Sequence, residues 1–202
     1  MAENMMKAKV TIRGTRPMLW HKFGPEALPL EKRERNGVAG NDPTEWERTH
    51  LVTKDGQLYV EPTYVFACAR DGGKYTRKGR SSLMPLVVAT MQVVEDIILI
   101  DRRMPKKITT DPSKAVYLDV RGVNNPGSRG RNIRYRVASS AGWKTTFHIT
   151  WDKTIISRGE MQAVLIDAGK LCGMGDGRSI GFGRFEVDEF EVVEDAKEQA
   201  AA

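Results

Sequence analysis

The stretch "CGMGDGRSIGFGRFEV" (residues 172–187) joins a predicted helix to a predicted strand through a loop rich in glycine. Bare backbone can approach another molecule closely, and guanidinium groups bind phosphate oxygens in pairs. The stretch therefore predicts a phosphate-binding loop, and the elements on either side of it decide which phosphate ligand it fits. Its five glycines and two arginines are Gly173, Gly175, Gly177, Gly181, Gly183, Arg178 and Arg184.

Three known kinds of nucleotide-binding motif do not fit this loop. A P-loop needs a glycine followed directly by Lys and then Ser or Thr, and no glycine of the chain is followed in this way. A GxGxxG dinucleotide motif that begins at Gly173 would have Arg178 in place of its third glycine, and it would need a strand before the loop rather than a helix. The aromatic-rich strand of an RNA-recognition motif lies mid-domain, whereas "GFGRFEV" is in the last strand and has Arg184 where an aromatic would stack.

The segment before the loop is predicted to be a helix. Ser157 and Glu160 have the spacing of a capping box, in which each side chain accepts a backbone N–H of the other. Gly173 is a natural C-terminal stop. The apolar residues that repeat at helical spacing between these ends, and that we expect to be buried, are Met161, Val164, Leu165, Ala168 and Leu171.

The rest of the chain reads as two strand–helix–strand halves. Pro62 suits the first position of a helix that frays at Gly72 and Gly73, and a short helix within 81–90 is expected to break before Pro85. His148 lies on the polar face of its strand, so we expect it to be exposed. Strands are predicted at 7–14, in a hairpin around Asp55 and Gly56, and at 91–101, 115–120, 132–138, 143–151 and 183–193.

This order of elements predicts an α+β fold of the ferredoxin-like (RRM-like) type, with an antiparallel sheet and helices on one face. Residues 102–141 are predicted to be a β-rich insertion into a single domain that covers residues 1–193. The last residues, 194–202, are acidic and are predicted to be a disordered tail.

The charge of the chain is strongly divided. Residues 188–202 carry six acids and one lysine, a net charge of −5. Because the whole chain has a net charge of +6, residues 1–187 carry a net charge of +11. A basic body predicts an anionic partner, and Tyr75 and Tyr135 are candidate platforms for stacked bases. Besides the loop arginines, two basic groups stand out: Lys74, Arg77, Lys78 and Arg80, and then Arg121, Arg129, Arg131, Arg134 and Arg136.

Other classes of chemistry have little support in the sequence. Cys68 and Cys172 lack the CxxC spacing of a metal site and are typical of a reducing cytoplasm. The N-terminus has no apolar signal region, and the longest apolar runs fall short of the roughly 20 residues that a membrane helix needs. We therefore expect a cytoplasmic protein with no cofactor, no metal and no membrane partner.

The motifs resemble those of a known superfamily. "LIDAGKLCGMGDGRSIGFGRFEV" (165–187) resembles the C-terminal glycine-rich signature of the RAMP superfamily, the CRISPR-associated RNA-binding proteins of the Cas5, Cas6 and Cas7 groups. "VTIRGTRPMLWHK" (10–22) is similar to the opening strand of that superfamily, and "KYTRKGR" (74–80) falls where Cas7-type members carry RNA-contacting bases. Region 102–141 matches no motif, although Cas7 backbone subunits commonly carry insertions there.

The resemblance implies a noncatalytic, Cas7-like backbone subunit that binds single-stranded RNA or guide RNA, and through it a complementary target nucleic acid. It also implies a head-to-tail homo-oligomer, in which the insertion reaches a neighbour and meets its acidic tail. The RNA-binding residues predicted from the loop, the basic groups and the resemblance are His21, Lys22, Lys74, Arg77, Lys78, Arg80, Arg129, Arg131, Gly175, Gly177, Arg178, Ser179, Gly181, Gly183 and Arg184.

Two alternatives stay open at this point. Cas6-type endoribonucleases, which need no metal, often carry a catalytic histidine after the first strand, where His21 stands here, and it would act as a general acid or base. No catalytic triad or metal constellation appears in the sequence, so we expect no catalytic residue. A phage structural protein that reuses the fold for another assembly is the second alternative.

Overall fold

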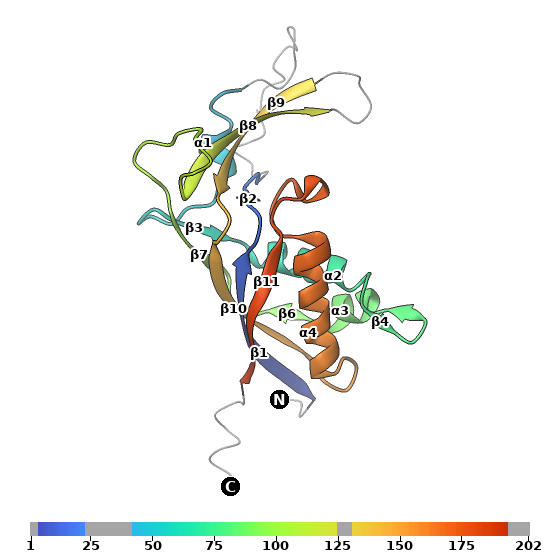
Figure 1. The fold of residues 1–202 in the computed structure, drawn as a ribbon. Helices are drawn as coiled ribbons and strands as arrows, with labels where there is room; N and C mark the ends of the chain where they lie inside the picture. Colours follow the sequence, from blue (N-terminus) through green and yellow to red (C-terminus); the bar gives the residue numbers. More distant parts are fainter. Residues whose placement is uncertain (1–3, 23–41, 125–130, 194–202) are drawn as a thin grey trace, which may run out of the picture.

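The alternation of apolar and polar residues builds an antiparallel central sheet. A computed structural model describes residues 4–22, 42–124 and 131–193 of the chain (Figure 1). The strands lie in the order β11-β1-β10-β7-β3, and β6 also pairs with β10. Their bounds are β1 Met5–Gly14, β3 Gln57–Val60, β6 Gln92–Val93, β7 Ile98–Arg103, β10 Lys144–Asp152 and β11 Phe185–Val193.

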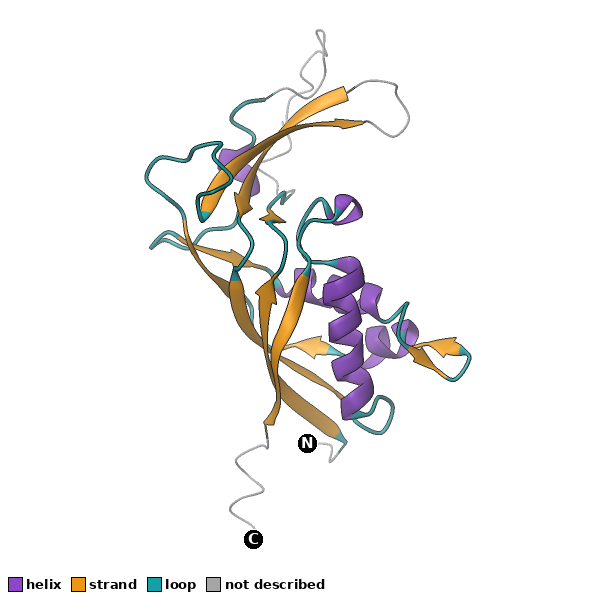
Figure 2. Ribbon diagram, viewed as in Figure 1, coloured by secondary structure: helices purple, strands orange, loops and turns teal. Residues whose placement is uncertain are grey.

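The strand order confirms the predicted α+β, ferredoxin-like fold. The four long strands stand in the spatial order fourth, first, third, second, and every pairing among them is antiparallel. Helices α2 (Pro62–Gly72), α3 (Met84–Thr90) and α4 (Arg158–Asp167) lie on one face of the sheet (Figure 2). None of the described helices is long and apolar enough to cross a bilayer.

The core lies between this sheet and the helices. The apolar stripe of β10 faces inward as predicted, because Trp143, Phe147, Ile149 and Trp151 are at most 1% exposed. Three buried indoles also satisfy their N–H groups, since Nε1 of Trp20, Trp143 and Trp151 donates to a backbone carbonyl at 2.8–3.0 Å. The packing and these hydrogen bonds together fix the strands that support the loop at 173–184.

The opposite face of the sheet is covered by paired charges. Arg13 of β1 contacts Glu186 and Asp188 of the adjacent strand β11, and Lys144 of β10 reaches Asp188 across β1. Lys9 and Arg13 of β1 thus both face carboxylates of the acidic strand β11. An anionic ligand gains little on such a neutralised surface, so the exposed sheet face is not the place to look for its site.

A long hairpin stands at one end of the sheet (Figure 1). Strands β8 (Val116–Asn124) and β9 (Arg131–Ser139) pair along their whole length, and β2 (Met18–Leu19) joins them as a third strand. These are the two strands predicted within region 102–141. The tip at 125–130 and the tail at 194–202 lie outside the described residues, so the predicted tail contact stays a prediction.

Two details of the segment 84–103 differ from the sequence prediction. The expected strand at 91–101 is two strands, β6 and β7, separated where Glu95 turns toward β10. Its carboxylate accepts the backbone N–H of His148 at 2.9 Å and lies 2.6 Å from Nδ1 of the same residue. His148 is therefore half-buried and paired rather than exposed. Pro85 lies in the first turn of α3, where the missing N–H breaks no helical bond, so it does not end the helix.

Helix α4 confirms its predicted start and the predicted stop at Gly173, although its last turn is not α-helical. The capping box of Ser157 and Glu160 is present. After Asp167 the chain continues as a wider π-helical turn, Ala168–Cys172, before Gly173 ends it with a φ of 80°. The wider turn rotates the last side chains, so Leu171 is 45% exposed instead of buried.

The cap gives a direct test of this helix start. Ser157→Ala removes the acceptor for the N–H of Glu160 and should lower the free energy of unfolding by about 1 kcal/mol, measured by urea denaturation. Ser81→Ala, at an exposed serine of β5 that is not a helix cap (the N-cap residue of the next helix, α3, is Leu83), should change it by less than about 0.5 kcal/mol. Equal effects of the two changes would contradict the role of the cap.

Candidate functional site

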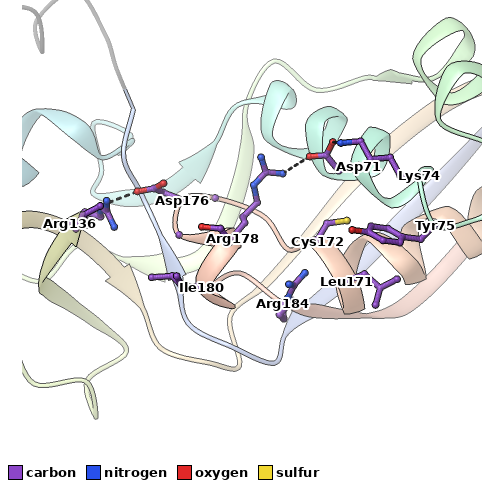
Figure 3. Close-up of a pocket in the computed structure, with 14 residues that line it drawn as sticks. Asp71, Lys74, Tyr75, Arg136, Leu171, Cys172, Asp176, Arg178, Ile180 and Arg184 are labelled. Carbon is purple, nitrogen blue, oxygen red and sulfur yellow. Dashed lines mark hydrogen bonds and ion pairs between the residues drawn. The ribbon is translucent and has the colours of Figure 1, made fainter. Parts of the chain in front are cut away.

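A cavity of about 590 Å³ opens beside the glycine loop. Its walls come from the end of α2, the π-helical turn, the loop itself and the hairpin β8–β9 (Figure 3). These segments are far apart in sequence, and the fold brings them together at the C-terminal end of α4. The lining residues are Asp71, Lys74, Tyr75, Val123, Arg136, Leu171, Cys172, Gly175, Asp176, Gly177, Arg178, Ser179, Ile180 and Arg184.

The glycines of the loop are required by the protein's own backbone. A Cβ at Gly175 would lie 2.6 Å from the carbonyl oxygen of Leu19, and one at Gly183 would collide with that of Met174. Only at Gly181 would a Cβ meet nothing within 4 Å. The glycines at 175 and 183 are therefore explained by contacts within the chain, without a ligand. All five, Gly173, Gly175, Gly177, Gly181 and Gly183, have a positive φ, between 69° and 93°.

Arg178 points across the cavity to the end of α2. Its Nη1 lies 3.0 Å from Oδ2 of Asp71, a residue 107 positions earlier in the chain. Lys74 contacts the other oxygen of Asp71 at 2.9 Å, and Arg70 contacts that oxygen at 3.2 Å. Burial by itself would raise the pKa of Asp71, but the hydrogen bond from Lys74 and the charge of Arg70 outweigh it, so the pKa lies below its usual value.

Arg184 is the unpaired cation of the cavity. Its side chain is half-buried, and Nη1 is a buried atom that has no hydrogen-bond partner among the described residues. Figure 3 shows it pointing into the cavity between Arg178 and Leu171. A buried guanidinium nitrogen without an acceptor is costly, so this position favours an anion supplied from outside the chain.

The hairpin is fastened to the loop by charged contacts. Arg136, only 8% exposed at its side chain, forms an ion pair with Asp176 in which Nε lies 2.9 Å from Oδ2. Arg121 stacks over Phe182 with its guanidinium carbon 4.4 Å from the ring centroid, and Asp119 holds it there. The position of the hairpin and that of the loop are therefore coupled.

The cavity combines positive charge with apolar surface. Four cations line it against two carboxylates, and three of the cations are paired with those carboxylates. Tyr75, Leu171 and Ile180 expose 45–60% of their surface around it. Such a site suits a ligand that is anionic in one part and flat or apolar in another, which is the chemistry of a nucleotide.

A second cavity, of about 290 Å³, lies on the other side of the loop. It shares Gly175, Asp176 and Arg178 with the first and is otherwise lined by His21, Thr63, Tyr64 and Ala67. Burial and the charges of Glu61 and Asp176 raise the pKa of Tyr64 to about 12, so its hydroxyl is a neutral donor at physiological pH. The segment Gly175–Arg178 thus separates two hollows that could both contact one extended ligand.

His21 is held at the edge of this second cavity by a buried carboxylate. Its Nε2 lies 3.0 Å from Oε1 of Glu45, and the same oxygen contacts Arg134 of the hairpin at 2.5 Å. Burial alone would raise the pKa of Glu45, but the hydrogen bond with His21 and the charge of Arg134 lower it below its usual value. The ionised Glu45 therefore fixes His21 and the hairpin to each other.

The structure brings some of the predicted residues together and leaves others elsewhere. Lys74, Gly175, Gly177, Arg178, Ser179 and Arg184 line the main cavity and His21 the second. Lys22 is paired with Glu61. Arg77 and Arg80 lie on the small exposed hairpin of β4 (Arg77–Lys78) and β5 (Ser81–Ser82), where Arg77 donates to the carbonyl of Arg80. Arg129 lies outside the described residues, and only the backbone pairing of Arg131 with Asn124 is described.

Lys78 lies at the wrong end of α4 for a contact with the loop. It donates to the carbonyl of Ile155 at 2.9 Å and pairs with Glu160 in the first turn of the helix. The loop begins at the other end, after Cys172. At 1.5 Å per residue, the segment 158–172 separates the two by roughly 20 Å. Lys78 and Lys74 therefore do not belong to one cluster.

Several residues of the site were not predicted. Asp176 appeared to lack a partner in the sequence, and its partner Arg136 was identified only as part of a basic run. Asp71 and Glu45 gave no signal, because their roles come from contacts made across the fold, and Leu171 was identified only as one of the apolar residues of the helix. No group of His, Cys, Asp or Glu in the part of the chain that the structure describes could hold a metal.

Comparisons with known proteins give distant likenesses among solved structures. No protein-family model and no curated protein matches the chain. Among solved structures, it is similar to a chain of the "Cryo-EM structure of the Type III-B Cmr-beta bound to cognate target RNA", with 12% sequence identity and a TM-score of 0.48. The match covers 95% of this chain and 61% of that one, so this chain spans about three-fifths of its neighbour's length.

Proposed function

We propose that this chain is a noncatalytic, Cas7-like subunit that binds single-stranded RNA, such as a guide RNA, in the cavities beside the glycine loop. The observation that carries the proposal is the arrangement of Arg184, Arg178 and Lys74 around a cavity that also exposes apolar side chains. Phosphates of the RNA backbone would contact the cations, and a base would lie against Tyr75 or Leu171.

The form of the site supports a strand rather than a single nucleotide. Two cavities lie on either side of Gly175–Arg178, so an extended ligand could contact both. Single-stranded RNA offers a phosphate at every nucleotide and bases that are free to turn toward the protein. The hairpin β8–β9, held to the loop through Arg136 and Asp176, would form one wall along the path of the strand.

Assembly and target recognition are part of the same proposal. Subunits would bind side by side along one RNA, with head-to-tail contacts between copies, and the exposed bases would pair with a complementary target. These contacts belong to partners that the structure does not contain. Their support is the resemblance of the motifs at 10–22 and 165–187 together with the basic body of the chain.

One observation keeps the endoribonuclease alternative in view. His21 is hydrogen-bonded to a carboxylate beside a cavity that also holds Tyr64 and Arg178. A histidine oriented by a carboxylate can act as a general base. RNA recovered intact after incubation without metal would favour the binding role, whereas cleavage that disappears in His21→Ala would favour the enzyme.

The proposal predicts how binding depends on salt. The logarithm of the association constant for a short single-stranded RNA should fall linearly with the logarithm of salt concentration, with a slope of about −0.7 per phosphate contact. Arg178→Ala and Arg184→Ala should each make that slope shallower by about 0.7, since each removes one contact. Fluorescence anisotropy over a salt series measures both.

The control is a change of equal charge away from the cavities. Arg103, which is exposed on β7 and pairs with Asp55, lines neither of them. Arg103→Ala should leave the slope unchanged. If all three variants have the slope of the parent protein, or if the parent does not bind RNA, the proposed site is wrong.

A further inference from the structure

A carboxylate already occupies the most cationic corner of the site. Asp71 is only 16% exposed at its side chain, and both of its oxygens are engaged. One contacts Arg178, and the other contacts Lys74 and Arg70. A single negative group that binds three cations, two of which (Lys74 and Arg178) line the cavity, has contacts like those that a phosphate would make there.

We propose that Asp71 is an internal competitor for phosphate, which lowers the affinity of the site and restricts it to ligands that present several phosphates at once. This inference rests on the proposed function for its RNA ligand. It adds to that function a residue that decides which anions are accepted, and no sequence motif pointed to it.

The contacts of Asp71 explain how the competition works. Arg178 can bind a phosphate only if it breaks its 3.0 Å contact with Asp71 or if its guanidinium contacts Asp71 and the phosphate at the same time. In the second case two negative groups lie against one guanidinium. In the first case the carboxylate of Asp71 loses Arg178 and keeps only Lys74 and Arg70. Either course costs free energy, so a single phosphate gains little at this corner.

A polymer overcomes this cost by binding at several points. Within the described part of the chain, Arg184 is not paired with a carboxylate, so a strand whose phosphate contacts Arg184 holds the next phosphate near Arg178 at a high effective concentration. The same corner would then bind an RNA strand while it excludes free phosphate. Selection by the number of phosphates follows from the pairing itself, without any contact to a base.

Asp71→Asn is the direct test. An asparagine carbonyl can still accept a hydrogen bond from Arg178, so the geometry is preserved while the negative charge is lost. Single-stranded RNA should bind about fivefold more tightly. Its salt slope should become steeper by about 0.7, as one more phosphate contact forms.

Inorganic phosphate provides a second measurement that does not depend on RNA. Millimolar phosphate should raise the melting temperature of Asp71→Asn and leave that of the parent unchanged, with sodium chloride at equal ionic strength as the reference. Because each protein is compared with itself, a loss of basal stability in the variant does not affect the result.

Two matched variants separate competition from other effects. Asp71→Glu keeps the charge and should bind RNA as the parent does. Asp188→Asn removes one negative charge from the paired face of the sheet, where it contacts Arg13 and Lys144, and should not tighten binding beyond the general effect of net charge. Tightening that is equal in Asp188→Asn and Asp71→Asn would overturn the inference.

The sign of the change decides between competition and support. If Asp71 instead positions Arg178 for the ligand, Asp71→Asn should weaken RNA binding, and that result overturns the inference while leaving the proposed function intact. The proposed function fails separately, if the parent protein does not bind RNA or if Arg178→Ala and Arg184→Ala leave the salt slope unchanged.

Discussion

Gly183→Ala is expected to lower the free energy of unfolding by about 2–5 kcal/mol. The residue has a φ of 70°, where an added Cβ costs about 1–2 kcal/mol in backbone strain. The Cβ would also collide with the carbonyl of Met174, and forcing an extra carbon into a packed site costs about 1–3 kcal/mol. Gly183 cannot move away easily, because its N–H donates to Pro17 at 2.7 Å and its carbonyl accepts from Met174 at 2.9 Å.

Gly181→Ala is the matched control within the same loop. Its φ of 93° is equally unfavourable for alanine, but its Cβ would meet no atom within 4 Å. It should therefore cost about 1–2 kcal/mol, from strain alone. The difference between the two variants in urea denaturation gives the packing contribution at Gly183. Equal losses of unfolding free energy in the two variants would contradict the close contact between Gly183 and the carbonyl of Met174.

This comparison shows what the glycine pattern means. The sequence shows that five glycines occur together, but not whether the nearby atoms belong to a ligand or to the chain. At Gly175 and Gly183 they belong to the chain, through the carbonyls of Leu19 and Met174. A phosphate-binding loop and a tightly folded loop have the same composition, since both need backbone that side chains would obstruct.

Local patterns did predict the framework. Alternation located β1, β10 and β11, and the capping box located the start of α4 to the residue, because these signals depend on neighbours within a few positions. Local patterns did not show the division of 91–101 or the exposure of Leu171. The carboxylate of Glu95 divides 91–101 by turning to His148, 53 residues away, and the π-helical turn exposes Leu171.

The site was predicted less completely than the fold for the same reason. Arg178 and Arg184 were identified from the loop itself. The pairings that define the site are long-range, since Arg178 meets Asp71 across 107 positions and Arg134 meets Glu45 across 89. No spacing rule connects such residues. Basic residues close in sequence can contact different elements, since Lys74 pairs with Asp71 of α2 whereas Lys78 pairs with Glu160 at the start of α4.

Long single-stranded RNA is expected to collect many copies of the protein, in particles whose mass rises in proportion to RNA length. If RNA binds as proposed, each copy would contact only the few nucleotides that cross its two cavities, so a long strand would offer many equivalent sites. Contacts between successive copies would be heterologous, since one end of a subunit meets the other end of the next, and such contacts do not close into a ring unless the rotation allows it.

The hairpin β8–β9 is the element best placed to make these contacts. It stands beyond the end of the central sheet (Figure 1), while its root is fixed to the loop by Arg136 and Asp176. A neighbour that bears on the hairpin would therefore act on the wall of the RNA site, and RNA in the site would orient the hairpin. We expect binding along the strand to be cooperative for this reason.

Light scattering on RNAs of increasing length tests the assembly, with protein below saturation. Cooperative binding predicts fully covered RNA beside free RNA, whereas independent binding predicts a uniform, partly covered population. The double variant Arg178→Ala and Arg184→Ala should not form the particles, and Arg103→Ala should form them as the parent does, because only the first pair lines the cavity. A parent protein that binds long RNA as one copy per strand, whatever the RNA length, would show that each subunit acts alone and that the hairpin serves only its own site.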